Sequence, residues 1–165
     1  MDIKAKAADF VAELKAEAVS TRKCLERIPE DKYDYKPHPT SMGFGELALL
    51  VAEIPLWIKT MVEDKYIDLA TFEHLKTKTT KALVEHFDKG LEGAIRAIEN
   101  AGEEDLKASF ILKAGGKVVM EVPNVEYIGP TINHWVHHRG QLTVYMRLCE
   151  IKVPSIYGPS ADERE

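Results

Sequence analysis

Four stretches of the chain repeat apolar residues at spacings of three, four and seven. Such spacing places the apolar side chains on one face of a helix. It predicts helices over about residues 5–28, 43–61, 80–100 and 125–150. The first apolar stripe, for example, consists of Val11, Leu14, Ala18, Leu25 and Ile28. Four amphipathic helices with short to medium connections predict a four-helix bundle whose core could house a ligand or a metal.

Between these stretches, one segment has a strand pattern. Residues 109–121, SFILKAGGKVVME, place two β-prone runs on either side of Ala114-Gly115-Gly116. This predicts a short β-hairpin before the last long helix. The stretch around 68–79 is weakly helical, and Pro55 should weaken or kink the second helix locally. The expected fold class is therefore all-α, with a hairpin inserted.

The length of 165 residues is typical of one domain, which we expect to span residues 1–160. Residues 161–165, ADERE, form an expected mobile tail. The 45% hydrophobic and 30% charged content is typical of a soluble globular protein.

The balance of charges and cysteines excludes several classes of partner. Against 27 acidic residues stand 22 basic ones, for a net charge of −5, so binding to nucleic acid or an anionic membrane is not expected. No apolar run is long enough to span a bilayer. The two cysteines, Cys24 and Cys149, fit a reducing compartment, and we expect a cytoplasmic protein.

Three of the six histidines lie together in NHWVHHRGQL. His134 and His138 are four residues apart, so both imidazoles can point at one centre from one helix face. His137 lies nearly opposite the apolar stripe. Spacing alone favours partly buried, hydrogen-bonded histidines over a metal site, because Trp135 stands where a zinc protease has its glutamate. The other three are expected in loops or on the surface: His38, His74 and His86.

Longer motifs carry a family resemblance. HHRGQLTVYMR followed by VPSIYGPSADE resembles the C-terminal signature of the DinB-like superfamily of damage-inducible, four-helix-bundle proteins. IPEDKYDYKPHPTSMGFGELALLVAEIPLW is similar to the first loop and second helix of that family. The resemblance implies a divalent metal, such as zinc, nickel or iron, held by three histidines. Two of these map onto His134 and His138.

The third expected histidine is missing. The family often has it on the second helix, where this chain has Leu50, and an alkyl side chain cannot coordinate a metal. Glu53 and Glu46 share the Leu50 side of the helix and could substitute for it, although ordinary solvent exposure is the preferred interpretation of both. A carboxylate with two imidazoles would favour iron, manganese or zinc.

Other residues of these motifs have a structural and a functional interpretation. Arg139 and Gln141 could contact a substrate, but bonds that tie the last helix to the C-terminal tail are preferred. Tyr145 could donate to a ligand, although a bundle tyrosine with one wet end is commoner. The remaining three are expected in the core: Trp57, Trp135 and Cys149.

Two functions follow from this pattern. In the first, the resemblance implies a metal-dependent thiol transferase or related enzyme that uses a low-molecular-weight thiol and a degenerate site at His134 and His138. In the second, the protein has lost both the metal and catalysis and binds a small apolar molecule in the vacated pocket. Leu50 favours the second hypothesis, and the retained histidine pair favours the first. A third possibility, a dimeric interaction protein, comes from the resemblance alone, which also implies a homodimer because relatives often pair through bundle helices.

Overall fold

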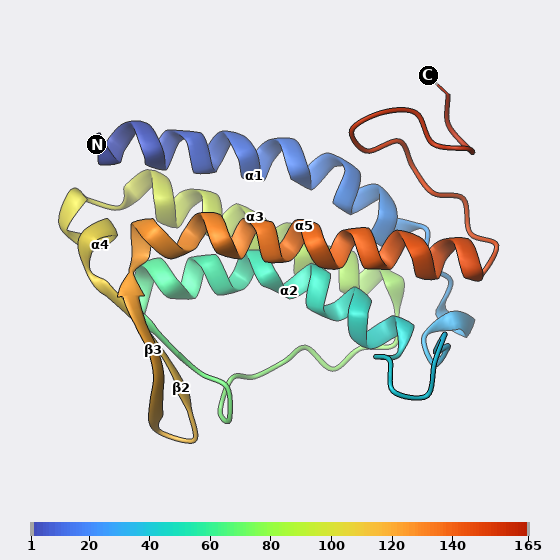
Figure 1. Ribbon diagram of the computed structural model, residues 1–165, viewed down its shortest axis with the longest axis horizontal. Coiled ribbons are helices and arrows are strands. Elements are labelled where there is room, and N and C mark those ends of the chain that lie inside the picture. Colours follow the sequence, from blue (N-terminus) through green and yellow to red (C-terminus); the bar gives the residue numbers. More distant parts are fainter. Residues whose placement is uncertain (1, 165) are drawn as a thin grey trace.

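The computed structural model describes residues 2–164 and confirms the four long helices (Figure 1). They are α1 (Ile3–Glu26), α2 (Phe44–Glu63), α3 (Thr80–Asn100) and α5 (Asn124–Leu148). Three starts have side-chain caps. The Asp2 carboxylate accepts from the Lys4 and Ala5 N–H groups, Thr79 accepts from Ala82, and the Glu46 carboxylate accepts from the Gly43 N–H. Such caps satisfy donors that the first helical turn leaves free.

The helices pack with α1 and α2 at opposite corners of the bundle (Figure 1). Contacts between α2 and α3 show that these two run parallel, since Gly90 approaches Leu56 and Gly93 approaches Lys59. The α1 and α5 helices also run parallel, while α5 is antiparallel to α2. Because parallel neighbours cannot be joined by a tight turn, the chain needs a long crossover between α2 and α3, residues 64–79.

The core fills the space between the four long helices. Its largest fully buried side chains include Phe44, Phe87 and Trp135, one from each of α2, α3 and α5. The α2 helix continues through Pro55. At Gly90 an added Cβ would lie 3.2 Å from the Leu56 backbone nitrogen, so this glycine permits the close approach of α2 and α3. No helix among residues 2–164 is long and apolar enough to cross a membrane.

The predicted hairpin is present and projects from one end of the bundle (Figure 1). Strand β2 (Ser109–Ala114) pairs antiparallel with β3 (Lys117–Pro123). Gly115 and Gly116 connect them with φ of 60° and 79°, a conformation that glycine adopts without strain and that two-residue hairpin turns require. A third strand, β1 (Tyr66–Asp68), pairs parallel with β2 and was not predicted.

One expectation about the connections is wrong. The weakly helical stretch 68–79 contains no helix, because Asp68 belongs to β1 and its carboxylate accepts from the Gly115 and Gly116 N–H groups of the hairpin turn. Gly102 follows the end of α3 and precedes the short helix α4 (Glu103–Lys107), where the Asp105 carboxylate accepts from the Gly102 N–H at 3.2 Å.

Candidate functional site

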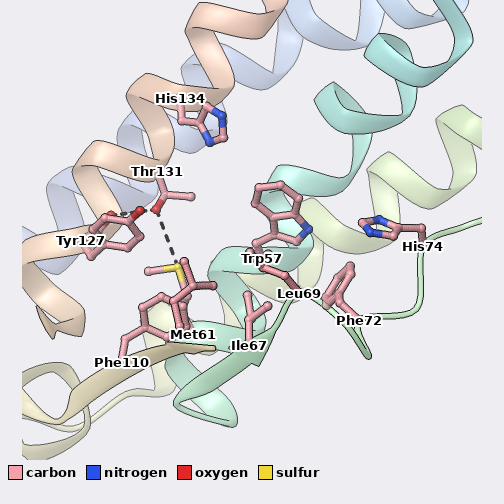
Figure 2. Close-up of a pocket in the computed structure, with 11 residues that line it drawn as sticks. Trp57, Met61, Ile67, Leu69, Phe72, His74, Phe110, Tyr127, Thr131 and His134 are labelled. Carbon is pink, nitrogen blue, oxygen red and sulfur yellow. Dashed lines mark hydrogen bonds between the residues drawn. The ribbon is translucent and has the colours of Figure 1, made fainter. Parts of the chain in front are cut away.

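A cavity of about 250 Å³ lies between α2, α5, the small sheet and the crossover (Figure 2). Five lining side chains come from α2 and α5: Trp57, Met61, Tyr127, Thr131 and His134. The crossover and β1 add Ile67, Leu69, Phe72 and His74, and β2 adds Phe110 and Leu112. Trp57 was expected in the core, but it is half-buried and forms one wall of this cavity.

The lining is apolar and aromatic, with few polar groups. None of its eleven residues carries a permanent charge. The Thr131 hydroxyl donates to the Tyr127 carbonyl oxygen at 2.8 Å, so this buried group is already satisfied. The groups that can direct a ligand are the imidazoles of His134 on α5 and His74 on the crossover, together with the Tyr127 hydroxyl and the Trp57 indole N–H (Figure 2). The indole N–H is buried and has no hydrogen-bond partner within residues 2–164. Such a cavity suits a neutral, largely apolar molecule with one or two polar atoms.

His134 and His138 lie side by side, as their spacing predicts. Their Nε2 atoms are 2.7 Å apart and their ring centroids 4.5 Å apart. His138 is buried, and its Nδ1 lies 2.8 Å from the Gln141 side-chain oxygen. His137 is exposed and does not line the cavity, although its ring touches that of His138.

The contacts of this pair determine which nitrogens carry protons when both rings are neutral. An amide oxygen only accepts, so His138 donates from Nδ1 and leaves Nε2 as an acceptor. His134 then donates from Nε2 to His138. Desolvation, helped by repulsion from His138 and His137, lowers the pKa of His134 below its ordinary value, which favours the neutral imidazole.

The register of α2 against α5 places Leu50 within one helical turn of His138 along the bundle. The ring centroids of Trp57 and His134 are 6.0 Å apart, and those of Phe44 and Tyr145 are 5.7 Å apart. Leu50 lies midway between Phe44 and Trp57 on α2, so on the antiparallel α5 it corresponds to about residue 140, roughly half a turn from His138. The half-buried Leu50 supplies an alkyl group at this position.

The residues present fit part of a metal site. The two Nε2 atoms converge, and the Gln141 oxygen orients His138 as outer-shell partners orient metal-bound histidines. A catalytic zinc site usually has three protein ligands, however, and residues 2–164 contain no group of three His, Cys, Asp or Glu side chains arranged to hold a metal. The residues present therefore supply two of the three protein ligands that a catalytic zinc site usually has.

Neither glutamate replaces the missing ligand in this arrangement. Glu46 is exposed, as expected, and its carboxylate caps α2 through the Gly43 N–H. Glu53 was expected in solvent, but only 1% of its side chain is exposed. Its carboxylate binds the His74 ring and the Leu75 N–H, both in the crossover. Its position on α2 was visible in the sequence, but its partners were not.

The other three histidines differ from one another. His38 is exposed in the first loop, as predicted, and bonds to Thr40. His74 lies in a loop but lines the cavity. His86 was expected on the surface, but its side chain is only 20% exposed and its Nε2 is buried 3.8 Å from a Glu53 oxygen. Desolvation lowers the pKa of His86.

Arg139 ties α5 to α1 and to the C-terminal segment. Its side chain is almost completely buried. It contacts the Glu17 carboxylate at 2.6 Å, the Ser20 and Thr21 hydroxyls, and the Tyr157 hydroxyl at 2.8 Å. The preferred structural role of Arg139 is confirmed. The same expectation is wrong for Gln141, which bonds to His138 instead.

The remaining expectations concern three single side chains. Tyr145 donates to the Met42 carbonyl oxygen at 3.2 Å, so its hydroxyl bonds within the protein. Trp135 is fully buried in the core, as predicted. Cys149 is half-buried just beyond the end of α5, which places it at the edge of the core. Burial raises the pKa of Cys24 to about 11, which disfavours a reactive thiolate.

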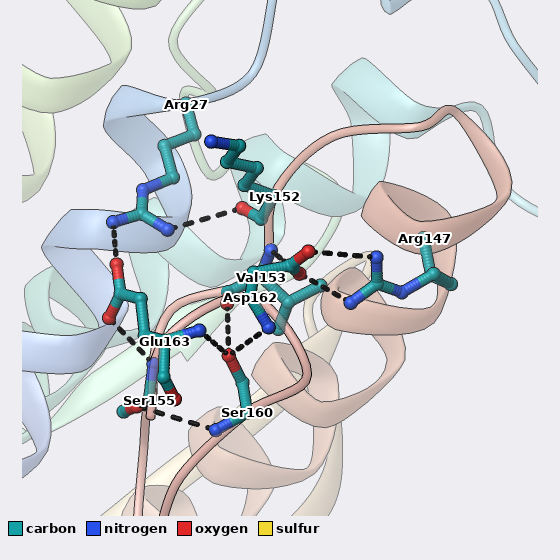
Figure 3. A network of polar contacts seen from close by, with 8 residues as sticks. All are labelled: Arg27, Arg147, Lys152, Val153, Ser155, Ser160, Asp162 and Glu163. Carbon is teal, nitrogen blue, oxygen red and sulfur yellow. Dashed lines mark hydrogen bonds and ion pairs between the residues drawn. The ribbon is translucent and has the colours of Figure 1, made fainter. Parts of the chain in front are cut away.

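The C-terminal segment is held by two ion pairs (Figure 3). Arg147 binds Asp162, and Arg27 binds Glu163. The same carboxylates accept from the Val153 and Ser155 N–H groups, each at 2.9 Å. The mobility expected for residues 161–165 stays a prediction, and Glu165 lies outside the described residues.

We expect acid to release this segment. Bonds from Arg147 and the Val153 N–H lower the pKa of Asp162, and bonds from Arg27 and the Ser155 N–H lower that of Glu163. A carboxylate with a lowered folded-state pKa stabilises the fold above its unfolded value, about pH 4, and this contribution disappears as the pH falls through the lowered value. Amide exchange at Val153 and Ser155, corrected for intrinsic rates, should therefore accelerate below about pH 4. Asp162→Asn should accelerate it already at pH 7; protection that persists at low pH would contradict the expectation.

Sequence reasoning missed the cavity because the crossover has no periodic pattern. The available signal was the group of isolated apolar residues in YIDLATFEHL, which a solvated loop does not need. Fold and site together define a class: helical bundles with a parallel α2–α3 crossover, an inserted hairpin and a histidine pair on the last long helix.

Comparison with known proteins agrees with that class. The sequence model of the DinB family matches residues 1–165, and the chain belongs to this family. It is 26% identical to YjoA of Bacillus subtilis over 134 residues, 77% of this chain and 80% of YjoA. A local match to B. subtilis YrdA has 46% identity over 43 residues and covers 26% of each protein.

Solved structures show the same fold. A crystal structure of the DinB-like protein YjoA from B. subtilis superposes with a TM-score of 0.69 at 20% identity, covering 95% of this chain and 99% of that one. A DinB-like protein from Bacillus cereus also has a TM-score of 0.69, at 24% identity, with coverage of 90% and 95%. Identities this low establish the architecture alone.

Proposed function

We propose that this DinB family protein binds a small, largely apolar molecule in the cavity between α2, α5, the sheet and the crossover. The observation that carries the proposal is a partly open cavity of about 250 Å³ whose lining is uncharged and rich in aromatic side chains, with imidazoles at its edge. An apolar cavity of about 150 Å³ is enough to hold benzene, so this one can accept a substituted aromatic ring. Leu50 supports the proposal because it makes the neighbourhood of the histidine pair drier and less polar.

p-Xylene, which has no hydrogen-bonding group, tests the cavity itself. At about ten times its dissociation constant a ligand adds about 1.4 kcal/mol to the stability of the folded state, which raises the Tm of a chain of this size by roughly 3–6 °C. Leu69→Trp should fill the mouth of the cavity and remove that shift. Val144→Trp on α5 is the matched control, because Leu69 and Val144 are both 57% exposed and only Leu69 lines the cavity. An equal shift in both variants would place the binding elsewhere.

A second candidate function is supported by the convergence of the two Nε2 atoms. The pair would hold a divalent ion such as zinc, nickel or iron, and the metal would lower the pKa of a bound thiol, as in a metal-dependent thiol transferase. His134 would first have to move its proton from Nε2 to Nδ1, since metal ligands bind through an unprotonated nitrogen. We place this candidate second because Leu50 contributes no third ligand.

Calorimetric titration with Zn²⁺ tests the second candidate. We expect weak binding that His134→Ala abolishes and that His137→Ala, the exposed neighbour, leaves unchanged. Binding that survives His134→Ala would show that the pair is structural. A homodimer remains a further proposal, which sedimentation analysis would test.

A further inference from the structure

Glu53 is a buried carboxylate, and each of its two oxygens accepts a hydrogen bond from the crossover. One oxygen lies 2.7 Å from His74 Nδ1, and the other accepts from the Leu75 N–H at 2.9 Å. From α3, His86 faces the same carboxylate with its Nε2 at 3.8 Å. A buried carboxylate needs such partners, and here they fix the position of the His74 ring relative to α2.

This contact determines what His74 offers to a ligand. A carboxylate accepts only, so His74 donates from Nδ1, and Nε2 keeps its lone pair while the ring is neutral. A carboxylate that holds a histidine in one tautomer and orientation is the arrangement found behind many functional imidazoles. The His74 side chain is 54% exposed, and its Nε2 forms no hydrogen bond within residues 2–164. Figure 2 shows its ring directed toward Trp57 at the edge of the cavity.

The cavity beside His74 selects against charged ligands and favours flat aromatic ones. No Lys, Arg, Asp or Glu lines it, so a charged ligand would be desolvated without a counterion. The rings of Trp57 and Phe72 pack edge to face with their centroids 6.2 Å apart, and the centroids of the Phe72 and His74 rings are 5.2 Å apart. Aromatic walls of this kind pack well against a further ring.

We propose that His74, held by Glu53, is the hydrogen-bond acceptor of this cavity, and that the ligand class is a small neutral aromatic molecule with a single hydroxyl, a phenol. The proposal rests on the proposed ligand-binding function and specifies its ligand. His134 is the alternative acceptor, because its Nε2 donates to His138 and leaves a lone pair on Nδ1, and the His134 variant below separates the two.

Two probes of equal size test the proposal. p-Cresol and p-xylene differ in one group, a hydroxyl in place of a methyl. Without a partner for the hydroxyl, the more apolar p-xylene binds more tightly, so the ratio of the two dissociation constants reports the hydrogen bond. In the wild type p-cresol should bind at least as tightly as p-xylene. His74→Phe keeps an aromatic ring and should shift the ratio roughly tenfold toward p-xylene.

Three variants make the outcome decisive, each checked for folding by its thermal melt. Glu53→Gln should move the ratio in the same direction as His74→Phe, because the ring is held less firmly. The surface variant His137→Ala should leave it unchanged, and His134→Ala, which alters the lining but keeps the acceptor, should move it less than His74→Phe does. If His134→Ala moves the ratio and His74→Phe does not, the acceptor is His134 and the inference is overturned. Binding of p-xylene with the same ratio in all variants overturns it as well, while the proposed function stands. If neither probe binds, both fail.

Discussion

Leu50→His should raise the affinity for Zn²⁺ by about 100-fold or more, or about 2.8 kcal/mol. The register of α2 against α5 places residue 50 roughly half a turn from His138, whose Nε2 lies 2.7 Å from that of His134. A third imidazole there would complete the three protein ligands usual in catalytic zinc sites and leave a fourth position open. This is the largest functional effect that we expect from one substitution.

The same substitution should cost stability when no metal is present. It removes the packing of a half-buried leucine and places a polar ring among apolar neighbours, at about 1–2 kcal/mol. Added Zn²⁺ should offset this loss by mass action on the folded state. Calorimetric titration and thermal melts of wild type and variant, each with and without metal, measure both effects.

The control is the double variant Leu50→His with His134→Ala, which should return to weak binding. Tight binding by the wild type with no gain in the variant would mean that another group already supplies the third ligand. Absence of binding in both proteins would mean that the histidine pair is structural and that the metal candidate is wrong.

Arg139→Met should produce the largest loss of stability, about 3 kcal/mol or more. The substitution leaves the Glu17 carboxylate, whose side chain is 13% exposed, without its cation. It also removes the guanidinium N–H groups that donate to the hydroxyl oxygens of Ser20, Thr21 and Tyr157. An unpaired buried charge costs more than the pair contributes, so methionine cannot compensate by filling the volume. Denaturant unfolding measures the change in the free energy of unfolding.

Arg22→Met is the matched control. Arg22 also binds carboxylates, those of Asp88 and Glu26, but its side chain is 44% exposed. Exposed pairs contribute at most about 1 kcal/mol because water and salt screen them. Equal losses in the two variants would contradict the role of burial in this argument.

Much of the fold follows from local pattern. Apolar spacing predicted the four long helices to within a few residues, since one face of each helix must be buried whatever its neighbours are. The Ala114-Gly115-Gly116 turn predicted the hairpin, because only certain residues adopt positive φ without strain. The spacing of His134 and His138 predicted that their rings would meet, since residues four apart share a helix face.

Pairings between distant segments could not be predicted from such local patterns in the sequence. The β1 strand has three residues, and it exists because Tyr66–Asp68 meets the edge of β2, some forty residues later. Whether Glu53 faces water or His74 depends on the path of the crossover over α2. The cavity likewise depends on how the crossover, sheet and helices close around one space.

The sequence by itself thus determined the helices, the hairpin, the histidine pair and, through its motifs, the DinB family. Only the tertiary structure decided that Glu53 is buried against His74, that Gln141 orients His138, and that Trp57 lines a cavity. The physical reason is range: helical spacing and turn conformation depend on a few adjacent residues, whereas burial and side-chain pairing depend on segments that only packing of the whole chain brings together.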